Sequence, residues 1–313
     1  MNAHPESAAA LPDVANDAHA EAAAALVWVG MQGLHVPLQL DADPAQWRCA
    51  PGKVGAWVNL PAASSRGIHM SRLYAQAENV LAGSHLSAGS LRRVLDGFLQ
   101  SHAGVSEHAR VQVEFDLLAR RAALLSDRHG WKLYPCRLDA RMAGGEMSLE
   151  LECRVGYSST CPASAALARQ LIQQRFDTDF TGSEAQHKAV HDWLGSEQGI
   201  CATPHGQRSE ARVTVKLDPA HASLPFEALI EAVEAALKTP LQTAVKREDE
   251  QEFARLNGEN LMFCEDAARR IHTALANDSR YTDYKIHCAH FESLHPHDAV
   301  AMAVKGVAGG YTE

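Results

Sequence analysis

The stretch Leu149-Glu150-Leu151-Glu152-Cys153-Arg154-Val155 alternates apolar with charged or polar residues at every step. Successive side chains of a strand point to opposite faces, so this run predicts a strand with one face in the core and one in water. One-sided burial of this kind is typical of antiparallel sheets. The same alternation predicts strands over 111–117 and 211–217. Less regular runs predict further strands over 54–60, 67–74, 131–141, 281–292 and 299–304.

Three other segments carry apolar residues at helical spacing, over 91–99, 226–237 and 264–275. Each forms one apolar stripe, which predicts a helix packed on a core. The apolar spacing of Leu167, Leu171 and Ile172 predicts a fourth helix after Pro162. The resulting order is strands, helix, strands, then helix, strand, two helices, strands. This order predicts an α+β fold in which helices cover one face of an antiparallel sheet. The two halves resemble each other, which indicates a duplicated module.

The composition of the 313 residues excludes several classes of protein. Hydrophobic residues make up 46%, the formal net charge is −9 and the isoelectric point is about 6.0. An acidic chain of this kind is not expected to bind nucleic acid or a membrane surface, and no apolar run approaches the roughly 20 residues of a membrane span. Seven cysteines without a CxxC pair indicate the reduced cytoplasm. Residues 1–25 are Ala-rich and contain no Lys or Arg, so we expect a disordered or weakly helical tail rather than a secretory leader.

The segment Ser158-Ser159-Thr160-Cys161-Pro162 places a cysteine where a helix should begin. Pro162 suits a first helical position, and the helix N-terminus favours a thiolate. A buried, inert cysteine is the ordinary alternative. The polar neighbours of Cys161 favour a functional role instead.

Two further segments carry residues that could join Cys161 in a metal site. His205 lies in a Pro/Gly turn just before the strand at 211–217, although a histidine in a turn is usually only solvated. The run 246–250 reads Lys-Arg-Glu-Asp-Glu, which is ordinarily a solvated helix start. One of its acids could complete a Cys/His/carboxylate set with an open position for water.

The segment 290–298 is rich in polar and ionisable residues at a strand end, and a Glu and a His there could transfer protons. Two alternatives stay open. His287, Cys288 and His290 could bind a metal, although alternation sends His287 to the opposite face. His295 and His297 could form a surface pair. Basic residues near these segments could be ordinary scattered surface charge, or several of them together could bind a triphosphate. They are Arg66, His69, Arg72, Arg208, Lys246 and Arg247.

Taken together and in this order, seven stretches resemble the type IB GTP cyclohydrolases. They run from about residue 27 to near the C-terminus, and it is their common register that makes the resemblance specific. The stretches are 29–31, 67–73, 157–162, 205–208, 246–250, 263–266 and 291–295.

The resemblance implies a tunnelling fold with two ββααββ-like modules per chain, over residues 26–145 and 146–313. It also implies a cytoplasmic homotetramer with active sites at subunit interfaces. The implied reaction converts GTP and water to 7,8-dihydroneopterin triphosphate and formate, the first step of tetrahydrofolate biosynthesis. Water activated by a divalent metal (Zn, Mn or Fe) attacks C8 of the purine in this reaction.

Site residues follow from the same resemblance. Cys161, His205 and Glu250 would be the metal ligands, with Cys161 essential for catalysis. Glu265 would accept hydrogen bonds from the guanine edge, and Glu292 and His295 would act at the reacting imidazole ring, His295 as the acid/base. Charge and position alone assign the triphosphate to Arg72, Arg208, Lys246 and Arg247.

The sequence departs from many relatives in two places. Ala163 stands where they have a second cysteine, and residues 177–199 form an insertion that we expect to be a partly helical segment or lid. The Ala163 departure supports a rival hypothesis, a purine- or pterin-binding protein of this fold that has lost its chemistry. A third hypothesis treats the histidines of the tail and the insertion as a metal-sensing or storage device.

Overall fold

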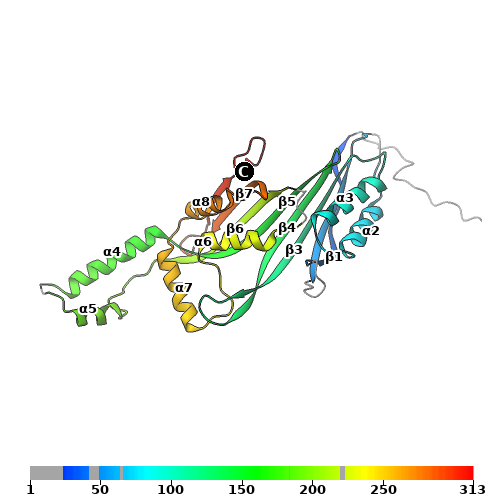
Figure 1. Ribbon diagram of the computed structural model, residues 1–313. Coiled ribbons are helices and arrows are strands. Elements are labelled where there is room, and N and C mark those ends of the chain that lie inside the picture. Colours follow the sequence, from blue (N-terminus) through cyan, green and yellow to red (C-terminus); the bar gives the residue numbers. More distant parts are fainter. Residues whose placement is uncertain (1–23, 42–48, 64–65, 183, 219–222, 313) are drawn as a thin grey trace, which may run out of the picture. The chain divides into compact units, whose positions relative to one another are not determined.

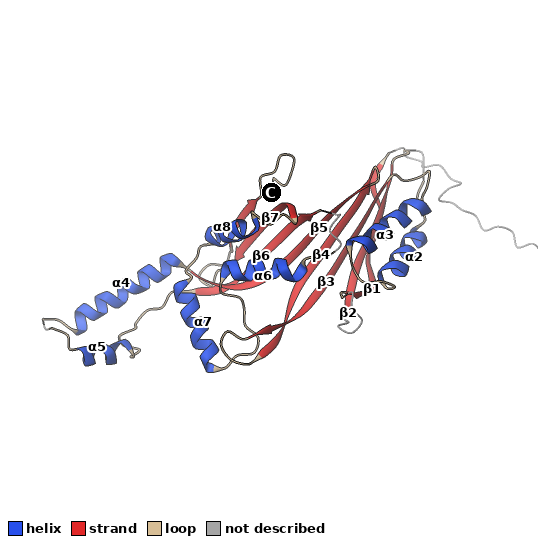
Figure 2. Cartoon of the chain, in the orientation of Figure 1, coloured by secondary structure: helices blue, strands red, loops and turns tan. Residues whose placement is uncertain are grey.

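The computed structural model describes residues 24–41, 49–63, 66–182, 184–218 and 223–312. Its strands form one eight-stranded sheet in chain order from β1 to β8 (Figures 1 and 2). The strands are β1 (Leu26–Gln39), β2 (Cys49–Leu60), β3 (His108–Ala122), β4 (His129–Ala143), β5 (Glu146–Thr160), β6 (Gly206–Leu217), β7 (Tyr281–His290) and β8 (Ala299–Val304). The helices are α2 (Met70–Leu81), α3 (Ala88–Ser101), α4 (Pro162–Asp179), α5 (His187–Leu194), α6 (Phe226–Leu237), α7 (Arg247–Glu259) and α8 (Cys264–Leu275).

The predicted fold class is confirmed: an antiparallel sheet carries helices in an α+β order. The first half of the chain runs β1-β2-α2-α3-β3-β4. The second half repeats this order as β5-β6-α6-α8-β7-β8, with α4, α5 and α7 added. The module boundaries at 26, 145 and 146 stay predictions. Of the predicted tail at 1–25, only residues 24 and 25 lie within the described residues.

The chain divides into two compact units, and β3, β4 and β5 contribute to both. One unit comprises residues 1–116, 137–150 and 218–224, and the other comprises 117–136, 151–217 and 225–313. In the first unit, α2 lies beside α3 and packs on β1 and β2. Its core includes Leu73, Leu91 and Phe98, all with no exposed surface. The core of this unit therefore lies between these two helices and the strands on which they pack.

The strand expected over 67–74 is wrong, because Met70–Leu81 forms helix α2. Its buried residues Leu73, Ala77 and Leu81 recur every four positions, which is the helical period rather than the strand period. Strand β1 was not predicted at all. Register shifts between Leu26 and Val29 and between Met31 and Leu34 interrupt its alternation.

In the second unit, α6 and α8 pack on each other and α8 packs on β7 and β8. Helices α4 and α5 extend away from the end of β5 as an arm (Figure 1). The arm has its own small aromatic cluster, in which Phe176 stacks on Phe180 at 4.8 Å and Trp193 meets Phe176 edge-on at 5.4 Å between ring centroids. The insertion at 177–199 is therefore partly helical, while a lid function stays a prediction.

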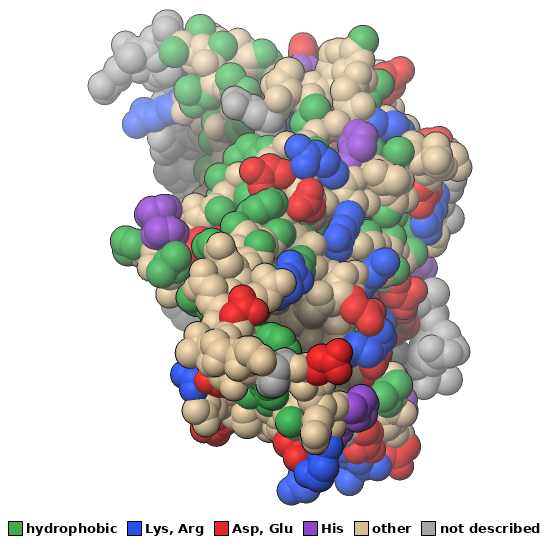
Figure 3. Space-filling model, turned by 90° about the vertical axis from the view of Figure 1, so that its left-hand side faces the viewer, with side chains coloured by type: hydrophobic (Ala, Val, Ile, Leu, Met, Phe, Trp, Pro, Cys, Tyr) green, Lys and Arg blue, Asp and Glu red, His purple; other side chains and the backbone are tan. Residues whose placement is uncertain are grey.

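Among the described residues, the face of the molecule shown in Figure 3 has no uniformly basic patch, as the acidic net charge of the sequence leads one to expect. Lys and Arg side chains are interspersed with Asp and Glu on the face shown in Figure 3. Within the described part of the chain, no helix has both the length and the apolar character needed to cross a membrane.

Helix α8 depends on its buried stripe, so Ile271→Ala should lower the free energy of unfolding by about 2–5 kcal/mol. The side chain of Ile271 is fully buried, and truncation leaves a cavity next to β7 and β8. Chemical denaturation measures the change. Arg269→Ala, on the exposed side of the same helix, should change stability by less than about 0.5 kcal/mol. Equal effects of the two substitutions would contradict the assigned core face.

Candidate functional site

The first part of the site is the junction between β5 and α4, where Cys161 occupies the N-cap position. Its Sγ accepts a hydrogen bond from the backbone N–H of Ser164 at 3.4 Å, and Pro162 fills the first helical position as expected. The sulfur therefore lies at the positive end of the α4 dipole. Cys161 is half-buried, whereas Cys153 and Cys264 are buried, as their strand and helix stripes indicate.

The loop before β6 is hydrogen-bonded to this junction. The Cys161 N–H donates to the His205 carbonyl at 3.2 Å, and the His205 N–H donates to Ser164 Oγ at 3.1 Å. Two residues separated by 44 positions in the sequence are thus fixed side by side.

His205 is also joined to Glu292, which follows the end of β7. His205 Nδ1 lies 2.9 Å from Gln207 Oε1, and Gln207 Nε2 donates to Glu292 Oε1 at 3.3 Å. The second carboxylate oxygen of Glu292 is 3.8 Å from His205 Nδ1. The side chains of His205 and Glu292 are only 23% and 14% exposed, so solvent screens their interaction weakly. The structure thus brings together Cys161, His205 and Glu292 in one unit.

Glu265 lies in the first turn of α8, and the segment before it is bonded to the same junction. The Met262 N–H donates to the Thr160 carbonyl at 3.1 Å, one residue before Cys161. Hydrogen bonds from its own backbone N–H and from the Cys264 thiol hold the pKa of Glu265 below its usual range. Glu265 is therefore an exposed, ionised acceptor at a helix N-terminus.

Glu250 lies exposed in the first turn of α7, next to the fully buried Asp249. Asp249 Oδ1 accepts from the N–H groups of Leu125 and Ser126, and its Oδ2 accepts from the Ser126 hydroxyl and the Lys246 N–H. Burial alone would raise the pKa of Asp249, but these hydrogen bonds hold it well below its usual range. Asp249 thus fixes the start of α7, and with it Glu250, against the β3–β4 turn.

His290, the last residue of β7, is a buried polar residue two positions before Glu292. Its Nε2 lies 3.0 Å from the Tyr157 hydroxyl, and its ring meets the Tyr157 ring edge-on. Burial lowers the pKa of His290 to about 4, although the nearby carboxylates Glu265 and Asp266 oppose this shift. As the alternation predicts, Cys288 and His290 are buried and His287 lies on the other face.

His295 lies exposed between β7 and β8, and its ring stacks on that of His297 with centroids 5.0 Å apart. Arg208 and Arg247 are also exposed, and Lys246 forms an ion pair with Asp127 at 2.7 Å. Arg72 belongs to the other unit, where its Nη1 donates to the Ser101 carbonyl. The roles of these residues, and of Glu250 and Glu265, stay predictions.

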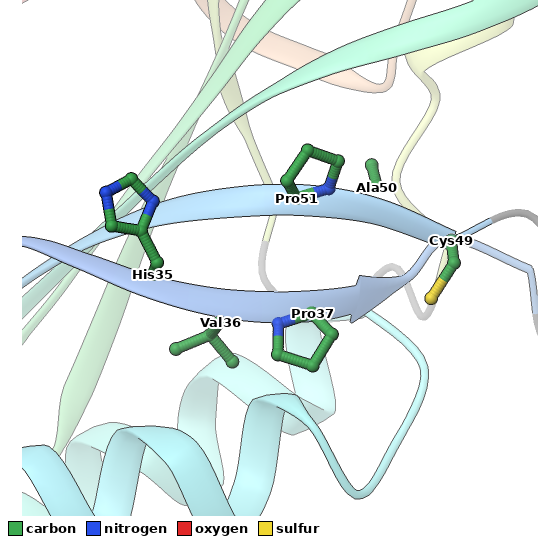
Figure 4. A pocket seen from close by; sticks show the side chains of 6 residues that line it. All are labelled: His35, Val36, Pro37, Cys49, Ala50 and Pro51. Atoms are coloured by element: carbon green, nitrogen blue, oxygen red, sulfur yellow. The ribbon is translucent and has the colours of Figure 1, made fainter.

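Across the described ranges, no group of three or more His, Cys, Asp or Glu side chains is placed to hold a metal ion. The assignment of Cys161, His205 and Glu250 as metal ligands stays a prediction. A pocket of about 330 Å³ lies elsewhere, at the paired ends of β1 and β2, and is mainly apolar (Figure 4). It is lined by His35, Val36, Pro37, Cys49, Ala50 and Pro51, none of them a predicted site residue.

Sequence reasoning missed four residues that organise the site, namely Ser164, Gln207, Asp249 and Tyr157. Gln207 lies inside the quoted stretch 205–208, and its position two residues after His205 on an extended segment was an available signal. The partner of Ser164 is 41 positions away, so its role was not visible in the sequence.

The family model and the curated relatives that match this sequence name the same family. A family model described as type I GTP cyclohydrolase folE2 matches residues 11–301. A protein of Hydrogenovibrio crunogenus named GTP cyclohydrolase FolE2 is 47% identical over 303 residues, covering 97% of each chain. One of the same name from Chromohalobacter salexigens is 50% identical over 299 residues, covering 96% of each. Among solved structures, uricase from Arthrobacter globiformis has a TM-score of 0.49 at 9% identity, covering 91% of this chain and 95% of its own.

Because Asp249 is held as an anion, Asp249→Asn should destabilise the protein at neutral pH. A carboxyl whose folded pKa is depressed contributes stability above its unfolded pKa, near 3.8, and loses it as pH falls through the folded value. Denaturation at pH 7 should therefore separate the variant from the wild type. The gap should shrink once the pH falls below 3.8. A gap that is constant across this range would contradict the assigned charge.

His290 should make the free energy of unfolding depend on pH at higher pH values than Asp249 does. The unfolded histidine binds a proton near pH 6.5 and the folded one only near pH 4, so stability is full above 6.5 and falls towards 4. The expected loss is on the order of 3 kcal/mol, from about 1.4 kcal/mol per pKa unit. His290→Gln removes this titration, so its unfolding free energy should fall less steeply between pH 6.5 and 4. Identical slopes in the two proteins would refute the assignment.

Proposed function

The chain belongs to the FolE2 family of type I GTP cyclohydrolases, and on that basis we propose that it converts GTP and water to 7,8-dihydroneopterin triphosphate and formate. This reaction is the first step of tetrahydrofolate biosynthesis. Relatives with that name match nearly the whole chain at 47–50% identity. The structural observation that carries the proposal is the juxtaposition of Cys161, His205 and Glu292 at the ends of β5, β6 and β7.

A divalent metal such as Zn, Mn or Fe would be held by Cys161, His205 and Glu250. A thiolate, an imidazole and a carboxylate suit these ions, and three protein ligands leave a position open for water. The adjacency of Cys161 and His205 supports this assignment, and Glu250 is its proposed third member. When bound, the metal supplies Lewis-acid activation of water for attack on C8 of the purine.

Other side chains would bind the guanine, orient the reacting groups and transfer protons. The ionised Glu265 would accept hydrogen bonds from the donor edge of guanine and so place the imidazole ring. Glu292 would orient groups at C8, and the exposed His295 would protonate a ring nitrogen as the C8–N bond breaks. Hydrolysis of the second C8–N bond releases C8 as formate, after which the sugar rearranges and closes the pterin ring.

As the sequence predicts from charge and position, we assign the triphosphate to Arg72, Arg208, Lys246 and Arg247. Guanidinium and ammonium groups are charge-assisted donors to phosphate oxygens. We also propose that the protein is a cytoplasmic homotetramer whose active sites lie between subunits. His295 and Glu265 are both exposed in the single chain. The proposed assembly would explain how they can act on the same substrate.

Ala163 favours a second candidate function, a purine- or pterin-binding protein of this family without catalysis. It is exposed in the first turn of α4, two residues after Cys161. The two functions are separated by incubating metal-stripped protein with GTP and added Mn or Zn. Formate release together with pterin fluorescence after oxidation supports the cyclohydrolase. Tight GTP binding without either product, whichever metal is added, supports the binding protein.

Cys161→Ala should lower turnover by more than about 100-fold, the upper range for losing a group that only supports a ligand. The substitution removes the sulfur while the fold is retained, because the Cys161 backbone N–H still bonds the His205 carbonyl. Formate release measures the effect, and circular dichroism checks the fold. Cys201→Ala, an exposed thiol four residues before His205, should leave turnover unchanged. Wild-type turnover in Cys161→Ala would contradict the assignment of Cys161 as a metal ligand.

A further inference from the structure

Gln207 lies between two residues to which the proposed function gives separate tasks. Its amide oxygen is 2.9 Å from His205 Nδ1, and its amide nitrogen donates to Glu292 Oε1 at 3.3 Å. His205 and Gln207 are two positions apart on extended chain, so their side chains share a face. One side chain therefore contacts both the proposed imidazole ligand and the proposed active-site carboxylate.

The chemistry of the three groups fixes which atom carries each proton. An ionised carboxylate only accepts hydrogen bonds, so Gln207 must present its NH₂ group to Glu292. Its carbonyl oxygen then faces His205, and an oxygen acceptor requires Nδ1 of the imidazole to carry hydrogen. The lone pair of neutral His205 is consequently on Nε2. This is the tautomer that a metal-binding Nε2 needs.

From this geometry we infer that Gln207 is a positioning residue, which fixes the tautomer and ring orientation of His205 and holds the carboxylate of Glu292. The inference rests on the proposed function for the identity of the metal ligand. It assigns to Gln207 two separable effects: metal affinity through His205, and the chemical step through Glu292.

The backbone around Gln207 is held by other bonds, so the side chain can be changed without dismantling the loop. The carbonyl of His205 accepts from the Cys161 N–H, and its N–H donates to Ser164 Oγ. The Phe291 N–H donates to the Arg208 carbonyl at 3.1 Å. None of these bonds uses the Gln207 amide. A loss of function in a Gln207 variant therefore reports on side-chain orientation.

The first test measures zinc affinity of the full-length protein by competition with a chromophoric chelator. Gln207→Leu removes both hydrogen bonds and should weaken zinc binding by about 10–100-fold, the range for losing the outer partner of a ligating histidine. Gln112→Leu is the matched control, because Gln112 Nε2 also donates to a glutamate, at 2.6 Å to Glu114 Oε1 on β3. Its zinc affinity should equal that of the wild type.

The second test uses Gln207→Glu, which keeps an oxygen facing His205 Nδ1 but sets a like charge against Glu292. Zinc affinity should stay within about threefold of the wild type, whereas kcat for formate release should fall by at least about tenfold. A residue with a merely structural role would not split these two quantities. This variant also keeps the inference testable if Gln207→Leu fails to fold.

The outcomes separate the inference from the proposed function. Wild-type zinc affinity in Gln207→Leu, with the protein folded, overturns the role of Gln207 and leaves the cyclohydrolase proposal standing. Equal loss of affinity in Gln207→Leu and Gln112→Leu also overturns it. A wild-type protein that binds zinc but releases no formate defeats the cyclohydrolase proposal alone, and the zinc affinities still decide on Gln207. A wild-type protein that binds no zinc overturns the role of Gln207 in zinc binding, and formate release with added Mn then decides on the cyclohydrolase proposal.

Discussion

The hydrogen bond from the Cys161 N–H to the His205 carbonyl is the constraint on which the site depends. It joins the end of β5 to the start of β6 across the whole α4–α5 arm. Ser164 reinforces it, because its hydroxyl accepts from His205 while its N–H donates to Cys161 Sγ. A thiol, an imidazole and, through Gln207, a carboxylate are thereby held on strand ends. Regular strands fix such groups more rigidly than free loops do.

The neighbouring helices are attached to the same point by polar contacts. Asn257 of α7 accepts from the Ser158 hydroxyl at 2.7 Å, and the Met262 N–H before α8 bonds the Thr160 carbonyl. Asp249 holds the other end of α7 against the β3–β4 turn. Buried polar groups of this kind destabilise a fold when unpaired, so each bond also specifies the position of its helix. The first turns of α7 and α8, which carry Glu250 and Glu265, are positioned in this way.

Much of this fold could be predicted because its periodic segments are long and one-sided. Helices α3, α6 and α8 and strands β3, β5 and β6 agree with the expected periods. The prediction is wrong or missing where periodicity is weak. Bulges interrupt β1, and the short run at 67–74 predicts a strand although residues 70–74 belong to α2. Cys161 and His205 could be singled out from turn and cap chemistry. The contacts of Ser164 and Asp249 could not, because each depends on partners that only the folded chain supplies.

X-ray absorption at the zinc edge of the zinc-loaded protein tests the central claim most directly. If Cys161 and His205 hold the metal, the spectrum should contain a single sulfur at about 2.3 Å with nitrogen and oxygen ligands at about 2.0–2.2 Å. The sulfur contribution should vanish in Cys161→Ala. A zinc shell without sulfur, or a sulfur shell that persists in Cys161→Ala, would contradict the assignment of the site to the β5–β6 junction.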